Sequence, residues 1–283
     1  MPRRAIYIIL IFVVIVVGIF VYIKYDKSNQ KFSVTFLNVG QGDSALIKFG
    51  NGEKMLVDCG IDQKVLQALG RNMPFYDRSI DYLLVTHPDS DHYGGCPGVL
   101  KRYKIKHIIT NGEEKTGDPY WSAWEKYVKN EGSTEQIINQ SQELSISDSQ
   151  LKFLSPDKNL DLGGKPATGN NSSIVFSLTH FKEKFLFMGD AELPLEDGLI
   201  KKYCASSTPV ICPTLQSDYI KIGHHGSDSS SGELFLEIVG PVKAIISVGK
   251  NTFGHPSFRI LKKLQRVGAE VLRTDKMGDI TLF

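Results

Sequence analysis

Cysteine is scarce in this chain: four residues, at positions 59, 96, 204 and 212, stand among 283. No two of them form a C-x-x-C pair, so the spacing argues against a zinc site built from thiolates. Cys204 and Cys212 are close in sequence and flanked by residues typical of loops. They either pair in a disulfide, which requires a domain outside the cytoplasm, or remain as buried free thiols. The sequence leaves both alternatives open.

Net charge is also small, at +2, which excludes the class of strongly basic, general nucleic-acid-binding proteins. The charge is unevenly distributed, however. The segment 241–283 contains eight Lys or Arg residues and three acidic residues. An anionic partner is therefore expected near this segment, although the solvated face of a helix would produce the same excess.

Long apolar runs are absent except near the N-terminus, where residues 5–23 read AIYIILIFVVIVVGIFVYI. At a rise of about 1.5 Å per residue, such a helix spans roughly 28 Å, close to the thickness of a hydrocarbon core. The run is longer than the apolar region of a signal peptide, and no small-residue cleavage site follows it. We therefore expect an uncleaved, single-pass membrane anchor with a short linker over residues 1–31.

The side of the membrane depends on a nearly balanced count of positive charge. Arg3 and Arg4 precede the apolar run, whereas Lys24, Lys27 and Lys31 follow it. A short basic N-terminus usually stays inside the cell. The working prediction is a cell-membrane protein whose catalytic domain, residues 32–283, lies outside the cytoplasm.

Along residues 32–283, a set of strands is followed by helices, and this order then occurs a second time. The length suits one large domain. This order favours two β-sheets packed face to face with helices outside, a four-layer αβ/βα sandwich that combines α+β and α/β character. The expected strands are 32–37, 44–49, 54–58, 80–86, 105–110, 173–178, 184–188, 218–223, 242–248, 269–273 and 279–283. The expected helices are 63–70, 93–104, 119–130, 192–203, 231–239 and 256–267.

The most informative segment is Thr86–His92, which reads THPDSDH. It holds four side chains that commonly bind metals, namely His87, Asp89, Asp91 and His92. Imidazoles and carboxylates this close repel or desolvate one another unless a cation compensates them. The segment leaves the carboxyl end of an apolar strand, where α/β folds place their chemistry. The pattern therefore predicts a metal site.

Three further polar positions follow predicted strands, namely Asp190, the pair His224-His225, and His255. Taken singly, Asp190 would be an ordinary helix cap and His255 an ordinary loop histidine. Two adjacent imidazoles after Gly223 rarely help packing, however. The coincidence of all these positions indicates one shared site.

The ordered motifs of the chain resemble those of a known family. They are FLNVGQGDS (36–44), LVDCG (56–60), THPDSDHYGG (86–95), NNSS (170–173), GD (189–190) and HHGS (224–227). Together they resemble the metallo-β-lactamase superfamily of dinuclear metal hydrolases and, within it, the hydrolase domain of the ComEC/Rec2 competence proteins. The resemblance extends from about residue 32 to the C-terminus and implies the metallo-β-lactamase fold.

One departure from the superfamily pattern bears on the metal. Asp89 stands where the broader superfamily has the second His of H-x-H-x-D-H, and Asn170 or Asn171 lies near its next expected His. Oxygen in place of nitrogen hardens the site and makes Mn²⁺ plausible beside the default Zn²⁺. It also moves the interpretation away from true β-lactamases. The ComEC/Rec2-like subgroup shares the Asp form.

The resemblance implies two divalent cations, Zn²⁺ or Mn²⁺, as cofactors. The implied metal ligands are His87, Asp89, Asp91, His92, Asp190 and His224. Of these, His87 and Asp89 would bind one ion, and Asp91 and His92 the other. Asp190 would bridge both ions, and His224 would complete the second site unless His225 holds that place.

The catalytic residues implied alongside Asp91 are His225 and His255. Whichever imidazole of the pair is not bound, or else His255, would protonate the leaving oxygen. Phosphate oxygens would be held by Asn171, Ser172, Ser173 and Ser227. Asp43 and Asp58 follow strands at turns, and we interpret them as supports for the ligands rather than ligands.

The function expected from this resemblance is that of a membrane-anchored, metal-dependent phosphodiesterase. DNA is its predicted substrate, and competence or envelope machinery its predicted partner. A phosphocholine or teichoic-acid esterase of the cell envelope, or a lactonase, is the alternative. A binding module without metals is disfavoured because every motif keeps its ligands. The sequence leaves cleavage polarity and oligomeric state open.

Overall fold

The computed structural model describes residues 7, 9–18, 31–118, 120–204 and 212–283. Residues 9–18 are helical, and their large apolar side chains are exposed. The expected anchor over residues 5–23 lies partly outside the described residues. Among those that are described, no helix is long and apolar enough to cross a membrane.

The first sheet has seven strands in the order β14-β1-β2-β3-β4-β5-β6. Its first three strands form the expected antiparallel meander, and β3 to β6 run parallel. Alternating apolar residues drive these segments to extend, because each strand must bury one face. The strands are β1 (Ser33–Phe36), β2 (Ala45–Lys48), β3 (Lys54–Val57), β4 (Ser79–Leu84), β5 (Lys104–Thr110), β6 (Thr134–Ile137) and β14 (Ile280–Leu282).

The second sheet also has seven strands, in the order β13-β12-β11-β10-β9-β8-β7. Strands β10 to β13 are parallel, whereas β7 to β10 are antiparallel. The strands are β7 (Gln142–Ile146), β8 (Ser149–Ser155), β9 (Val175–His180), β10 (Glu183–Phe187), β11 (Tyr219–Lys221), β12 (Lys243–Ile246) and β13 (Glu270–Arg273).

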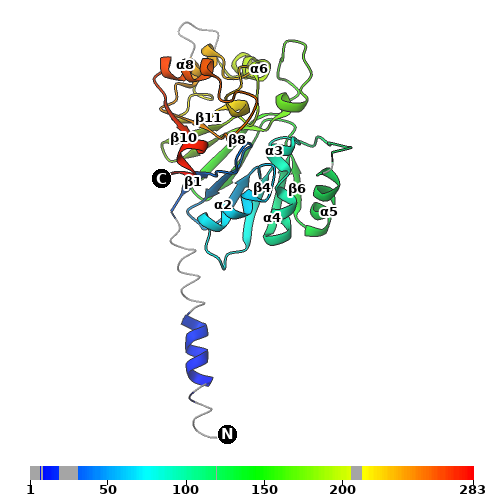
Figure 1. Ribbon diagram of the computed structural model, residues 1–283, viewed down its shortest axis with the longest axis vertical. Helices are drawn as coiled ribbons and strands as arrows, with labels where there is room; N and C mark the ends of the chain where they lie inside the picture. The colour runs from blue at the N-terminus through cyan, green and yellow to red at the C-terminus, as the bar shows by residue number, and fades with distance from the viewer. Residues whose placement is uncertain (1–6, 8, 19–30, 119, 205–211) are drawn as a thin grey trace.

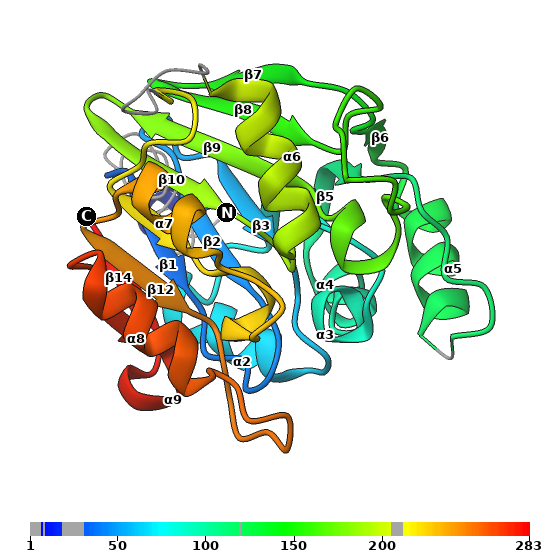
Figure 2. The same cartoon turned by 90° about the horizontal axis from the view of Figure 1, so that it is seen from above.

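The two sheets pack face to face with helices on their outer faces (Figure 1), which confirms the four-layer αβ/βα arrangement. One apolar core fills the space between the sheets, and two others lie beneath the helices. The first sheet is covered by α2 (Lys64–Asn72), α4 (Cys96–Arg102) and α5 (Trp121–Glu131). The second is covered by α6 (Leu193–Tyr203), α7 (Glu233–Val239) and α8 (Phe258–Arg266), as Figure 2 shows for α6 and α7. Short helices are α3 (Ser90–Tyr93), α9 (Thr274–Met277) and the 3-10 turns η1 (Gly169–Ser172) and η2 (Gly223–Gly226).

The last strand departs from a simple repeat. After β13 the chain leaves the second sheet, and β14 pairs antiparallel with β1, so that Phe36 lies opposite Ile280. The C-terminal strand therefore closes the edge of the first sheet.

All four cysteines lie in the described residues, and all are paired. Cys204 bonds to Cys212, which is the disulfide alternative left open by the sequence. Cys59 bonds to Cys96, a pairing that the sequence did not predict. This second bond connects the loop after β3 to the first residue of α4.

Candidate metal centre

The predicted ligands converge where four strands end. The segment 86–92 follows β4, Asp190 follows β10, His224 and His225 follow β11, and His255 lies in the loop after β12. Strands β4, β10, β11 and β12 each run parallel to at least one neighbour. Polar side chains from both sheets therefore meet at one edge of the sandwich.

The imidazoles of His87 and His92 are fully buried, with ring centroids 4.2 Å apart. His87 precedes the one-turn helix α3, and His92 lies within it. Oδ2 of Asp58 lies 2.9 Å from Nδ1 of His92. Because a carboxylate only accepts, Nδ1 carries the proton, and Nε2 is left facing the centre of the site.

Asp190 stands in the middle of the imidazoles. Its Oδ1 lies 3.2 Å from Nε2 of His92, and its Oδ2 lies 3.5 Å from Nε2 of His225. The backbone N–H of Asp190 donates to Oγ of Ser173 at 3.0 Å. Gly189 allows this close approach, since a Cβ there would lie 2.9 Å from Cβ of Ser173.

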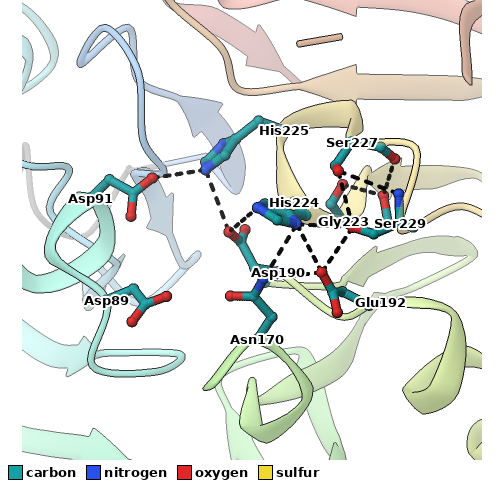
Figure 3. A network of polar contacts seen from close by, with 12 residues as sticks. Asp89, Asp91, Asn170, Asp190, Glu192, Gly223, His224, His225, Ser227 and Ser229 are labelled. Atoms are coloured by element: carbon teal, nitrogen blue, oxygen red, sulfur yellow. Dashed lines mark hydrogen bonds and ion pairs between the residues drawn. The ribbon is translucent and has the colours of Figure 1, made fainter. Parts of the chain in front are cut away.

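His225 joins the second group of ligands. Its Nδ1 donates to the carbonyl oxygen of Ser247 at 2.9 Å, so Nε2 is free to face the site. Nε2 lies 3.1 Å from Oδ2 of Asp91 (Figure 3). Ligand atoms of Asp91, His92 and His225 all lie within 4.8 Å of one another. The geometry thus favours His225 as the third ligand of this group, the alternative that the sequence left open.

His224 is turned differently. Its side chain is 25% exposed, and its Nε2 lies 4.0 Å from Oδ2 of Asp190. Its Nδ1 lies 3.3 Å from Oε1 of Glu192 and 3.2 Å from Oγ of Ser229. Glu192 therefore orients the His224 ring so that Nε2 points into the site from its rim (Figure 3).

The turn that carries both imidazoles has an unusual backbone. His224 and His225 have φ values of 46° and 52°, the left-handed region that non-glycine residues rarely adopt. Such residues cost on the order of 1 kcal/mol each and concentrate at functional sites. Gly226 follows at φ 81°, where a Cβ would lie 2.7 Å from Cβ of Pro256. Because of this left-handed backbone, the adjacent side chains of His224 and His225 point in different directions.

Asp89 lies at the edge of the site rather than in its centre. One carboxylate oxygen pairs with Lys115, and the other lies 3.5 Å from Nε2 of His87. Its side chain is 30% exposed. The His87 imidazole, together with Lys115, holds the pKa of Asp89 well below its ordinary value.

Charge in the centre is strongly unbalanced. Asp43, Asp58 and Asp190 are all buried, and Lys221 is a buried cation that pairs with Asp43 and lies 3.8 Å from Asp190. Burial alone would lower the pKa of His225, but Asp190 and Asp43 raise it to about 10. Burial likewise opposes a charge on His92, yet Asp190 and Asp58 raise its pKa well above the usual value.

The donor set fits divalent cations. Among the described residues, Nε2 of His87, Nε2 of His92 and Oδ1 of Asp190 are buried and make no hydrogen bond, although the last two atoms lie 3.2 Å apart as an ion pair. Such orphaned atoms are rare unless an ion or water completes them. Without a cation, protons on the imidazoles must balance the carboxylates. Divalent ions would replace those protons, and His87, His92 and Asp190 form one ligand group beside the group that contains Asp91 and His225.

The predicted phosphate-binding residues are largely engaged in other contacts. Ser172 is buried and donates to Glu113, and Oγ of Ser173 accepts from the N–H of Asp190. Oδ1 of Asn171 accepts from the N–H of Glu192 at 3.3 Å. Oγ of Ser227 lies 3.0 Å from Oγ of Ser229. These side chains support the ligand loops in this structure.

His255 lies at the rim, with its ring centroid 5.4 Å from that of His224 and 6.5 Å from that of His225. Burial, together with the positive field of those two residues, lowers its pKa. A neutral imidazole therefore stands beside the mouth of the site.

Sequence reasoning missed Glu192, Lys115 and Lys221. A lysine inside the otherwise apolar strand β11 was a detectable signal, because a buried ammonium needs a carboxylate partner. Glu192 follows Asp190 by two residues and carried no such signal. Asp43 and Asp58 contact the imidazoles from behind, at 3.3 Å from Nδ1 of His225 and 2.9 Å from Nδ1 of His92.

The sequence model described as the Metallo-beta-lactamase superfamily matches residues 37–250. The chain is 29% identical to ComE operon protein 3 of Bacillus subtilis (strain 168), over 92% of this chain and 34% of that protein. It is 28% identical to Competence protein ComA of Neisseria gonorrhoeae, over 94% of this chain and 34% of that protein. The chain thus spans about a third of the length of these curated relatives.

A solved structure shares the fold. The metallo-beta-lactamase fold protein YhfI from Bacillus subtilis superposes with a TM-score of 0.58 at 13% identity, over 90% of this chain and 100% of that chain. At this identity the likeness shows the fold alone.

Proposed function

The chain belongs to the metallo-beta-lactamase superfamily, and from that membership and the buried donor set we propose that it is a two-metal phosphodiesterase that cleaves DNA. The observation that carries the proposal is the pair of adjacent ligand groups, His87–His92–Asp190 and Asp91–His92–His225. The groups overlap at His92, whose Nε2 can bind only one of the two cations, and Oδ2 of Asp190 in the first group lies 3.5 Å from Nε2 of His225 in the second. Such a donor set suits two neighbouring divalent cations, Zn²⁺ or Mn²⁺.

Two cations held by these residues would lower the pKa of a bound water towards neutrality and would stabilise negative charge on the oxygens around phosphorus. The protein's own residues would do the rest. Asp58 and the Ser247 carbonyl fix the tautomers of His92 and His225, so that both Nε2 atoms stay aimed at the centre. Glu192 would hold the proton on Nδ1 of His224. That leaves Nε2 of His224 at the rim to exchange a proton with the leaving oxygen, with His255 adjacent.

Location outside the cytoplasm, on a membrane anchor, belongs to the same proposal. Two disulfides support the location outside the cytoplasm, because such bonds persist in oxidising compartments and are rare in the cytosol. The names of the competence relatives support a partner in DNA-uptake machinery. Machinery of the cell envelope is the alternative partner.

The test is a cleavage assay with the full chain in mild detergent, supplied with Mn²⁺ or Zn²⁺ and end-labelled single- and double-stranded DNA. We expect cleavage that disappears with EDTA and falls at least about 100-fold in Asp91→Ala. Asp148→Ala, an exposed residue of the β7–β8 turn, is the matched control. No cleavage by the wild type, or equal cleavage by Asp91→Ala, would refute the proposal.

One observation favours the esterase alternative. A cavity of about 540 Å³ beside Pro88 is lined by aromatic Tyr93 and Trp121 and by acidic Glu113 and Glu114. Aromatic faces with nearby carboxylates suit a quaternary ammonium such as choline. Turnover of bis(4-nitrophenyl) phosphate, 4-nitrophenyl phosphorylcholine and a lactone would separate the classes. A marked preference for the phosphorylcholine ester, lost in Trp121→Ala, would favour the esterase.

A further inference from the structure

Two large aromatic side chains project into solvent next to the metal centre. Phe253 and Phe258 are each 72% exposed, and only five positions separate them. Single exposed apolar residues are common on protein surfaces and need no explanation. Two exposed phenylalanines so close in sequence, one of them beside His255 at the rim of the site, form a more specific feature.

Neighbouring residues connect these phenylalanines to the His224–Gly226 turn. The ring centroid of Phe253 lies 5.8 Å from that of His255, which lies 5.4 Å from that of His224. The N–H of Ser257, the residue before Phe258, donates to the carbonyl oxygen of Gly226 at 2.9 Å. The two aromatic side chains therefore occupy a segment that packs on the His224–Gly226 turn.

All the charged residues in and around this segment of the sequence are cationic. Residues 241–269 contain six Lys or Arg residues and no acidic residue. The Arg259 side chain is 82% exposed, with its nearest charged partner, Asp228, at 3.9 Å. The ammonium of Lys262 lies 5.4 Å from the ring centroid of Phe258. A hollow of about 540 Å³ lies among Phe258, Arg259 and Lys262. This places cations beside the exposed rings.

We propose that Phe253, Phe258, Arg259 and Lys262 form a binding site for single-stranded nucleic acid that leads into the metal centre. The rings would stack on bases while the cations contact phosphates, the combination that single-strand-binding proteins use. Duplex DNA would bind more weakly, because its bases are already stacked on one another and cannot stack on a phenylalanine ring. The site deepens the proposed function, on which it rests, by naming the strand state of the substrate.

The test measures binding apart from cleavage. The full chain in mild detergent and EDTA is titrated into a fluorescein-labelled oligothymidine 12-mer, and separately into a duplex of equal length, with anisotropy as the readout. We expect tighter binding of the single strand, weakened roughly 10- to 100-fold in Phe253→Ala/Phe258→Ala. Phe181→Ala is the matched control. Phe181 is 76% exposed in the β9–β10 turn, at the end of β10 opposite Asp190.

The cationic part is tested by salt dependence. Lys262→Gln should lower the slope of log affinity against log salt by about one phosphate contact. Lys243→Gln is its control, because Lys243 begins β12 at the end remote from the site and lies 3.5 Å from Glu270. An unchanged slope in Lys262→Gln would overturn the role of the cations.

Three results would overturn the proposal as a whole: equal affinity for the two strand states, equal loss in Phe181→Ala, or unchanged single-strand affinity in Phe253→Ala/Phe258→Ala. If metal-loaded chain fails to cleave DNA while binding still depends on Phe253 and Phe258, the proposed function fails and the binding site stands. If both hold, the aromatic double variant should also lose cleavage of single-stranded DNA.

Discussion

Asp58 holds His92 from behind: its Oδ2 lies 2.9 Å from Nδ1 of the imidazole, while Nε2 of the same ring lies 3.2 Å from Oδ1 of Asp190. Asp58 also accepts hydrogen bonds from the N–H and the hydroxyl of Thr86, each at 2.8 Å. One carboxylate thus fixes both the ring that faces the centre and the start of the ligand segment.

Replacing this carboxylate should weaken metal binding without removing a ligand. In Asp58→Asn, the amide keeps the shape of the side chain but loses the negative charge. That charge makes Nε2 of His92 a stronger ligand for a metal ion. We expect metal affinity to fall roughly 10- to 100-fold. Competition with a chromophoric chelator measures the change, and Asp148→Asn in the β7–β8 turn serves as control. Unaltered affinity in Asp58→Asn would show that Asp58 has only a structural role.

Glu196 should make the stability of the chain depend on pH. It is buried in α6 and accepts the N–H groups of Ser231 and Gly232 at 2.6 and 2.7 Å. Burial raises its pKa from 4.5 to about 7. The folded state therefore binds the proton more tightly than the unfolded state, and ionisation opposes folding. Stability attributable to this group is present below about pH 4.5 and is lost as pH rises through about 7.

The expected loss is about 3 kcal/mol in the free energy of unfolding between pH 4.5 and pH 8. Urea denaturation of metal-stripped chain measures it. Glu196→Gln should flatten this part of the profile, although it is less stable at every pH because one amide hydrogen would face a backbone N–H. The exposed neighbour Asp197→Asn is the control. A profile in Glu196→Gln that still falls by the same amount would contradict this assignment.

The two disulfides should contribute unequally to stability. Cys59–Cys96 spans 37 residues and Cys204–Cys212 spans 8. Because closing a longer loop restricts the unfolded chain more, removal should cost about 4 kcal/mol for the first bond and about 2.5 kcal/mol for the second. Urea denaturation of Cys59→Ala/Cys96→Ala and Cys204→Ala/Cys212→Ala tests this. Equal losses would contradict the chain-entropy explanation.

Much of the fold followed from local pattern. The expected strand 184–188 is β10 (Glu183–Phe187), and the expected helix 192–203 is α6 (Leu193–Tyr203), because alternation and amphipathic spacing act over a few neighbours. The pairing of β14 with β1 involves Phe36 and Ile280, whose proximity no local pattern encodes. The Cys59–Cys96 bond was missed for the same reason.

The site divides in a similar way. Its ligand types were recognisable because His87, Asp91 and His92 stand in one short motif. Which of His224 and His225 binds the metal could not be predicted from the sequence, because both residues follow the same strand. It depends on two left-handed backbone conformations and on remote partners, the Ser247 carbonyl for one ring and Glu192 for the other.

The paired histidines should respond differently to substitution. Nε2 of His225 lies 3.1 Å from Asp91, whereas Nε2 of His224 lies 4.0 Å from Asp190 at the rim. His225→Ala should therefore lose about one equivalent of bound metal, measured by elemental analysis. His224→Ala should keep both metal equivalents. Its loss of activity should be large for substrates whose leaving oxygen must be protonated and small for substrates whose leaving oxygen need not be. DNA cleavage should fall roughly 100- to 10,000-fold.

Hydrolysis of bis(4-nitrophenyl) phosphate distinguishes the two roles, because nitrophenolate leaves without protonation. It should be nearly unchanged in His224→Ala and strongly reduced in His225→Ala. His107→Ala controls for loss of a histidine elsewhere, since His107 stacks on Tyr82 on the first sheet. If His224→Ala loses a metal equivalent while His225→Ala retains both, then His224 is the ligand, and the strained turn must rearrange when the cations bind.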